Sequence, residues 1–282
     1  MNTLKIVIFL IFALFLVGCS GKYEVTPQRL DNIKATAKIV NLSTNKTMDF
    51  DDFIVEVLDA DILLVGELHD DFDHHLAEIL LIKALSKNKN IDVAFEMLGG
   101  DKQKYADGLD KKTRPGELIK AIKWNDKMWE LRHYKGVLEA AFYSANIKCA
   151  NLSEDEIKLI FTGAQPISGK FSTSKSIQEA IVKIIRGAHG GVNKQDIQKL
   201  VQAQQYKDRR MADVVNKSAN FALLIAGRYH VQKDIGVPLH LMDFKTKKKF
   251  KTLFLGFDGD DTSAKEADYL WKFNKGTRWL KF

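Results

Sequence analysis

The fold is decided by residues 62–69, which read ILLVGELH. Their first four residues form a continuous apolar run, as in strands that are buried on both faces, and this run stops at Gly66. Similar apolar runs occur at residues 91–95, 147–150 and 221–226. Segments with helical spacing of apolar residues separate these runs, at residues 73–86, 128–145 and 153–218. This alternation predicts an α/β fold with three layers, in which helices flank a mainly parallel sheet.

Other segments predict structures at the edges of this sheet. A β-hairpin is expected from residues 37–42 and 46–48, followed by a helix over residues 49–58. A second hairpin is expected from residues 239–244 and 250–257. Residues 99–127 are polar and interrupted by Gly and Pro, which predicts a cap of short helices. We assign residues 36–282 to a single domain of this kind.

The N-terminus has the pattern of a bacterial lipoprotein signal. Lys5 precedes an apolar run over residues 6–17, which ends in Gly18 and Cys19. That run is shorter than the roughly 20 residues needed to span a bilayer, and it fits a secretory signal. We therefore expect a signal peptide at residues 1–18, a lipid anchor on Cys19 and a polar tether over residues 19–35. The expected location is the surface of a bacterial membrane, the outer membrane by preference.

Composition excludes several classes of protein. The chain has 282 residues, of which 45% are hydrophobic and 28% charged, and only 2 are Cys, which excludes a disordered or disulfide-stapled protein. The formal net charge is +7, from 43 basic and 36 acidic residues. These basic residues form no long stripe, so no nucleic-acid partner is expected. The excess fits an anionic small ligand or an anionic membrane surface.

Polar residues follow each predicted strand at the point where it ends. Glu67 and His69 follow the first strand, Glu96 the second, Asn151 the third and His230 the fourth. In parallel sheets, ligands bind outside the carboxyl ends of the strands. The first and fourth strands also share the pattern Gly-x-x-His, in which Gly would allow a sharp exit from the strand. We therefore expect a functional rim at this edge of the sheet.

A second polar cluster follows His69. His74 and His75 lie four and three residues before Glu78, so either pair could share a helix face and bind a metal. Helix capping by the neighbouring aspartates, with Asp73 as the cap of the helix, is the alternative that spacing favours. The zinc-protease, P-loop and serine-hydrolase motifs HExxH, GxxxxGK[ST] and GxSxG do not occur in the sequence.

Three tyrosines are candidate ligands for ferric iron. A phenolate is an anionic oxygen donor suited to iron, including haem iron. Tyr229 stands between Arg228 and His230, which favour a phenolate, while Tyr134 and Tyr206 lie in predicted helices. Packing within the fold is the simpler explanation for the last two.

Several of these motifs together resemble the ChaN-like cofacial haem-binding family of iron-regulated bacterial lipoproteins. The matching segments are residues 64–69 (LVGELH), 74–78 (HHLAE), 94–97 (AFEM), 129–134 (WELRHY), 208–212 (DRRMA), 226–230 (AGRYH) and 236–238 (GVP). The resemblance implies a fold related to erythromycin-esterase-like proteins and a haem pocket shared by two subunits of a homodimer. It also implies a Tyr ligand to the iron and basic residues on the haem propionates.

The resemblance does not say which Tyr binds iron. Tyr229 is our first choice because it lies on the rim within a matching motif, followed by Tyr134 and then Tyr206. Arg228, His230 and Lys233 are the expected propionate partners. An outer-membrane haem receptor or transporter is a further expected partner.

The same resemblance extends to a wider group that contains metal-dependent proteases and esterase-like enzymes. On that alternative, His69 and His230 would hold a divalent metal, and Glu67 or Glu96 would activate a water molecule. The rim residues alone leave haem binding and metal-dependent hydrolysis both open.

Overall fold

A computed structural model describes residues 23–188 and 193–274. The expected signal peptide at residues 1–18 and the expected lipid anchor at Cys19 lie outside these ranges. No helix within the described ranges is long and apolar enough to cross a membrane.

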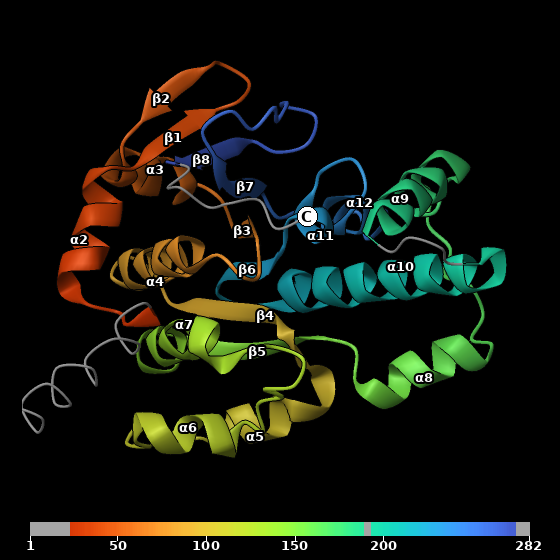
Figure 1. Cartoon of the computed structure of the whole chain (residues 1–282), viewed down its shortest axis with the longest axis horizontal. Helices are drawn as coiled ribbons and strands as arrows, with labels where there is room; N and C mark the ends of the chain where they lie inside the picture. Colours follow the sequence, from red (N-terminus) through yellow and green to blue (C-terminus); the bar gives the residue numbers. More distant parts are fainter. Residues whose placement is uncertain (1–22, 189–192, 275–282) are drawn as a thin grey trace, which may run out of the picture.

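The centre of the molecule is one eight-stranded sheet with the order β2-β1-β8-β7-β3-β6-β4-β5 (Figure 1). The strands are β1 (Lys38–Asn41), β2 (Lys46–Met48), β3 (Ile62–Glu67), β4 (Ile91–Gly99), β5 (Asn146–Asn151), β6 (Phe221–Gly227), β7 (Phe250–Phe257) and β8 (Tyr269–Phe273). The six strands from β8 to β5 are parallel to one another, whereas the hairpin β1–β2 joins β8 in antiparallel orientation. The predicted mainly parallel α/β sheet is confirmed.

Helices cover both faces of the sheet. They are α2 (Pro27–Ala35), α3 (Phe50–Val57), α4 (Phe72–Ser86), α5 (Gln103–Asp107), α6 (Pro115–Ala121), α7 (Leu131–Ser144), α8 (Glu154–Thr162), α9 (Lys175–Ala188), α10 (Lys194–Lys217), α11 (Arg228–Val231) and α12 (Val237–Asp243), with a 3-10 turn η2 (Gly100–Lys102). The short elements η2, α5 and α6 form the predicted cap. Helices α8, α9 and α10 extend beyond one side of the sheet in Figure 1.

The apolar core is divided by the sheet into two layers. Along β3, Leu63 and Val65 pack into the layer that also contains residues of α3, α4 and α7. Ile62 and Leu64 point the other way, into the layer formed with α10 and α12. All four side chains are fully buried. A strand that is buried on both faces must be apolar throughout, which is why this segment reads as a continuous apolar run.

The predicted second hairpin is wrong. Residues 237–243 form helix α12 instead of a strand, and Pro238 occupies its first turn, where a missing N–H costs nothing. Strand β7 pairs with β3 and with β8, and β8 was not predicted.

Two further expectations near the N-terminal side also differ from the structure. The cap of α4 is Asp71, whose side chain accepts the N–H of Asp73, and Asp73 lies in the first turn. Residues 27–35, expected to belong to the tether, form α2, which packs against α4.

Candidate functional site

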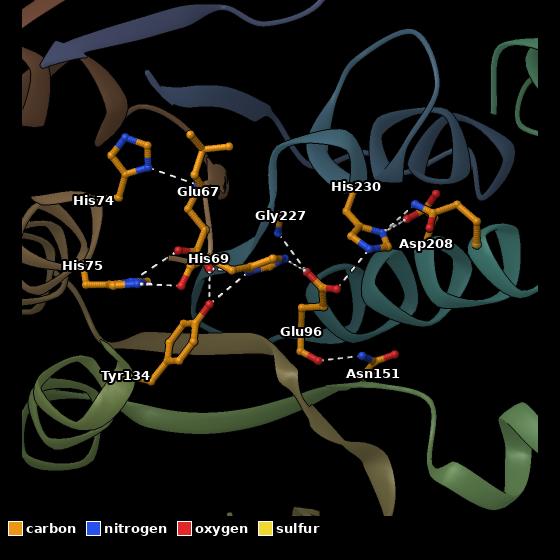
Figure 2. Close-up of polar contacts among 12 residues, drawn as sticks. Glu67, His69, His74, His75, Glu96, Tyr134, Asn151, Asp208, Gly227 and His230 are labelled. Atoms are coloured by element: carbon orange, nitrogen blue, oxygen red, sulfur yellow. Dashed lines mark hydrogen bonds and ion pairs between the residues drawn. The ribbon is translucent and has the colours of Figure 1, made fainter. Parts of the chain in front are cut away.

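The polar residues that follow the central strands meet at one edge of the sheet. Strand β6 lies between β3 and β4, and Glu67 is paired in register with Gly227. Glu96 of β4 accepts the backbone N–H of Gly227 at 2.8 Å. Asn151 of β5 donates its side-chain N–H to the backbone oxygen of Glu96 at 2.6 Å. The structure thus brings the predicted rim together (Figure 2).

The two Gly-x-x-His glycines serve close packing rather than the predicted sharp exit. Neither has a positive φ. A Cβ on Gly66 would lie 2.6 Å from a methyl group of Val231 and 3.0 Å from the Cα of Arg228. A Cβ on Gly227 would lie 2.8 Å from Nε2 of His69. Any side chain here would displace α11 or His69.

One half of the rim is a buried group of ion pairs centred on His230. Its Nε2 lies 3.0 Å from Glu96 Oε1, and its Nδ1 contacts both Asp208 and Gln204 (Figure 2). Burial alone would lower the pKa of His230, but the charges of Glu96 and Asp208 raise it to about 10. Burial would raise the pKa of Glu96, but the His230 charge holds it well below its usual range. His230 is therefore an imidazolium between carboxylates.

The other half is centred on Glu67. Its Oε1 accepts the Tyr134 hydroxyl at 2.7 Å and lies 2.9 Å from Nδ1 of His69. The ring of His69 also packs edge-on against Trp129. Burial, together with the negative charge of Glu67, raises the pKa of Tyr134 far above its usual value. Tyr134 is thus held as a neutral phenol that donates to Glu67.

The cluster on α4 contains a helix cap and a pair of neighbouring polar side chains. Asp71 caps the helix, and Nδ1 of His74 accepts the backbone N–H of Leu68 at 3.0 Å. His75 faces the sheet, where its Nδ1 lies 3.1 Å from Glu78 and 3.3 Å from Glu67. Of the two spacings, the structure brings together His75 and Glu78.

The three candidate tyrosines lie in different environments. Tyr229 is 54% exposed, whereas Tyr134 is 1% exposed. The hydroxyl of Tyr206 donates to the backbone oxygen of Gln165 at 2.6 Å. Only Tyr229 of the three lines the cavity described next.

The basic candidates are already paired with acidic residues. Arg228 forms an ion pair with Asp260 at 3.0 Å, and Lys233 forms one with Asp268 at 2.7 Å. Arg228 borders the cavity. Both pairs are partly exposed, so each cation can still attract an anion.

A cavity of about 660 Å³ opens beside the rim. His69, Asp208 and His230 contribute to its polar part. Its apolar lining includes Leu68, Ile235 and, from α9, Ile181, Ile184 and Ile185. The volume lies in the usual range for ligand pockets, which are mostly apolar with a few fixed polar groups.

Sequence reasoning missed Asp208 and the apolar wall of the cavity. Asp208 lies on α10, away from any strand end, although it belongs to a segment that carries the family resemblance. The isoleucines of α9 recur at spacings of three and four residues, a helical periodicity that could have identified the wall.

Comparison with known proteins gives one strong match. Residues 53–241 match the family described as haem-binding uptake, Tiki superfamily, ChaN. The structure of ChaN from Campylobacter jejuni, described as showing cofacial heme binding, is 39% identical, with a TM-score of 0.79, and the alignment covers 84% of this chain and 97% of that one.

Other similarities are weaker. A mutant of the erythromycin esterase EreC is 13% identical with a TM-score of 0.46, and the alignment covers 83% of this chain and 81% of that one. The toxin effector domain RRSP from Vibrio vulnificus is 13% identical with a TM-score of 0.43, covering 86% of this chain and 40% of that one. No curated protein gives a significant match. The family match and the Campylobacter structure agree over most of the chain, which therefore belongs to the ChaN haem-binding family.

Proposed function

We propose that this protein binds haem in the cavity beside α9 and α11, with the Tyr229 phenolate as the ligand of the ferric iron. The observation that carries the proposal is the position of Tyr229, which lines an apolar cavity with its side chain half exposed. Family membership supplies the ligand class. The bound iron would supply a Lewis-acidic centre for one anionic oxygen.

The cavity fits a large, flat, apolar ligand with a polar edge. Isoleucines of α9 provide an apolar surface on which a porphyrin ring could pack, at the same cavity as Tyr229. Arg228 lies next to Tyr229 and is 23% exposed, so it can also attract a propionate. Lys233 and His230 fit this role less well, since Lys233 does not line the cavity and His230 is held by two carboxylates.

A second copy of the chain would complete the pocket. Leu68 and Tyr229 line the cavity, yet they are 39% and 54% exposed. Large apolar side chains that remain exposed together at a ligand site are typical of a surface that a partner covers. We therefore propose that haem binding and homodimerisation are linked, with haem at the interface.

The hydrolase alternative requires His69, His230 and a carboxylate to converge on one divalent ion. Among the described residues, the group of three acidic or imidazole side chains whose ligand atoms lie within 4.8 Å of one another contains neither His69 nor His230. We therefore assign the rim a structural role in shaping the cavity.

We further propose that Cys19 carries a lipid that holds the protein on a bacterial membrane, the outer membrane by preference, where a haem receptor or transporter would exchange the ligand. The apolar run before Cys19 supports this proposal. Labelling cells with a clickable fatty acid should mark the wild-type protein and leave Cys19→Ser unmarked. Equal labelling of both would refute the anchor.

Haem binding is tested by titrating residues 22–282 with hemin while absorbance and sedimentation are followed together. We expect a saturable high-spin ferric spectrum of the kind that phenolate ligation gives, together with conversion of monomer to dimer. The Tyr229→Phe variant should lose this spectrum, because phenylalanine offers no oxygen to the iron.

The matched control is Tyr143→Phe. Tyr143 is 48% exposed, but its hydroxyl donates to the backbone of Thr113, away from the cavity. An unchanged spectrum in Tyr229→Phe would exclude Tyr229 as the ligand, and absence of saturable binding in the wild type would refute the proposed function.

A further inference from the structure

A second cluster of carboxylate and imidazole side chains lies behind the rim, on the side of the sheet that α4 covers. Glu67, His75 and Glu78 each offer an oxygen or nitrogen atom, and these atoms all lie within 4.8 Å of one another. Among the residues that the structure describes, no other three His, Cys, Asp or Glu side chains bring their ligand atoms this close together. Glu67 is 1% exposed, and His75 and Glu78 are completely buried.

His75 is oriented as metal-binding histidines usually are. Its Nε2 lies 3.2 Å from the backbone oxygen of His69, so the N–H of this nitrogen donates to a carbonyl. Its Nδ1 points at the two carboxylates, as the dashed line to Glu67 shows in Figure 2. In metal sites the second ring nitrogen typically donates to a carbonyl or carboxylate, which fixes the tautomer and aims the first nitrogen at the metal.

The spacing of the ligand atoms also fits a metal. His75 Nδ1 lies 3.1 Å from Glu78 Oε2 and 3.3 Å from Glu67 Oε2. Ligand atoms about 2.1 Å from a tetrahedral ion are separated from one another by about 3.4 Å. A cation could therefore enter between these three atoms with only small movements of the side chains.

Two buried carboxylate oxygens of the cluster lack hydrogen bonds within the described part of the chain. Glu78 Oε1 and Glu67 Oε2 are buried and have no hydrogen-bond partner among the described residues. Buried polar atoms without a hydrogen bond are costly, and a cation between these oxygens would bind both of them.

We propose that Glu67, His75 and Glu78 form a structural binding site for a divalent transition cation, Zn²⁺ in preference to Mn²⁺. One imidazole and two carboxylates suit both ions, and Zn²⁺ binds a given site of this kind more tightly. This site is separate from the proposed iron ligand Tyr229. It touches the rim through Glu67, because the other oxygen of that carboxylate holds Tyr134 and His69. The cation would thereby fix the floor of the cavity.

Because the site is fully buried, the ion must be loaded while the chain folds. The full chain in detergent is unfolded and refolded with Zn²⁺, with Mn²⁺ or with EDTA, washed with EDTA, and analysed for metal by mass spectrometry. We expect about one Zn²⁺ per chain in the wild type. Glu78→Gln keeps the shape of the side chain but removes its charge. The Zn²⁺ retained per chain should therefore be about tenfold lower in this variant than in the wild type.

The matched control is Glu139→Gln. Glu139 lies on α7, its burial raises its pKa, and its Oε1 likewise has no hydrogen-bond partner among the described residues. This variant should retain as much Zn²⁺ as the wild type. No retained Zn²⁺ in the wild type would overturn the proposal, as would equal retention in Glu78→Gln.

X-ray absorption at the zinc edge gives an independent test that requires no variant. We expect one nitrogen and two oxygens from the protein at about 2.0–2.2 Å. A shell containing sulfur would place the ion at a cysteine and overturn the proposal. The hemin titration is read separately, so failure of haem binding would refute the proposed function and leave this result intact.

Discussion

Replacement of Glu96 by Gln should show how much the buried ion pairs around His230 contribute to the free energy of unfolding. The pKa of His230 rises from 6.5 to about 10 on folding. Each pKa unit corresponds to about 1.4 kcal/mol, so the imidazolium contributes roughly 5 kcal/mol to the free energy of unfolding. Because the folded pKa is raised, this contribution is fully present below pH 6.5 and is lost as the pH rises towards 10.

About half of that contribution should depend on Glu96. Glu96 and Asp208 flank the imidazolium, and Asp208 remains in the variant. Gln can still accept the N–H of Gly227, so the backbone contact survives. We therefore expect Glu96→Gln to lower the free energy of unfolding by about 2–3 kcal/mol at pH 6, and by close to zero near pH 10.

Urea denaturation at pH 6 and pH 9.5, in buffers with EDTA, measures this difference. Both proteins are first unfolded and refolded in EDTA, so that no bound cation contributes. Glu179→Gln is the control, because Glu179 is 69% exposed and its ion pair with Lys175 should contribute little at either pH. A destabilisation by Glu96→Gln that is the same at both pH values would refute the assignment of a protonated His230.

Three substitutions test the packing that holds the rim in place. Leu64→Ala leaves a cavity in the fully buried centre of β3, and should lower the free energy of unfolding by about 2–5 kcal/mol in urea denaturation; a loss below 1 kcal/mol would contradict its core position. Asp71→Ala removes the cap of α4 and should cost about 1 kcal/mol in the same assay, whereas no change would mean that the cap contributes nothing. Gly66→Ala places a methyl group 2.6 Å from Val231, so it should shift the thermal unfolding midpoint downward by several degrees, and an unchanged midpoint would show that α11 moves away freely.

The central strands could be predicted because strands buried on both faces are apolar throughout, without the alternation of polar and apolar residues that a half-exposed strand has. Strands β3, β4, β5 and β6 therefore read as apolar runs. Residues 239–244 (LHLMDF) contain four apolar residues, but a segment this short does not distinguish strand from helix. Gly236 at the N-cap and Pro238 in the first turn favour a helix here. Strand β8 was missed because it follows a polar loop and owes its conformation to pairing with β1 and β7.

The site was predictable to the extent that strand ends determine it. Glu67 and Glu96 had to lie at the same edge of the sheet, because the carboxyl ends of parallel strands lie together, with β6 between β3 and β4. Asp208 reaches the rim from α10, and only the packing of that helix on the sheet brings it there. The environment of Tyr134 is likewise set by helix packing, since the sequence alone does not say whether α7 turns this side chain towards Glu67 or towards solvent.

The charged residues of the rim pair with one another, which explains how a polar edge can lie beside an apolar pocket. Glu96 holds His230, and Glu67 holds His69 and Tyr134, so these groups contact one another. A rim of unpaired ions would favour water in the cavity and resist a porphyrin ring, because each ion would lose its hydration when the ligand bound. Pairing the ions within the protein removes that cost before the ligand arrives. Tyr229, half exposed beside the paired rim, is the residue that we propose to bind the iron.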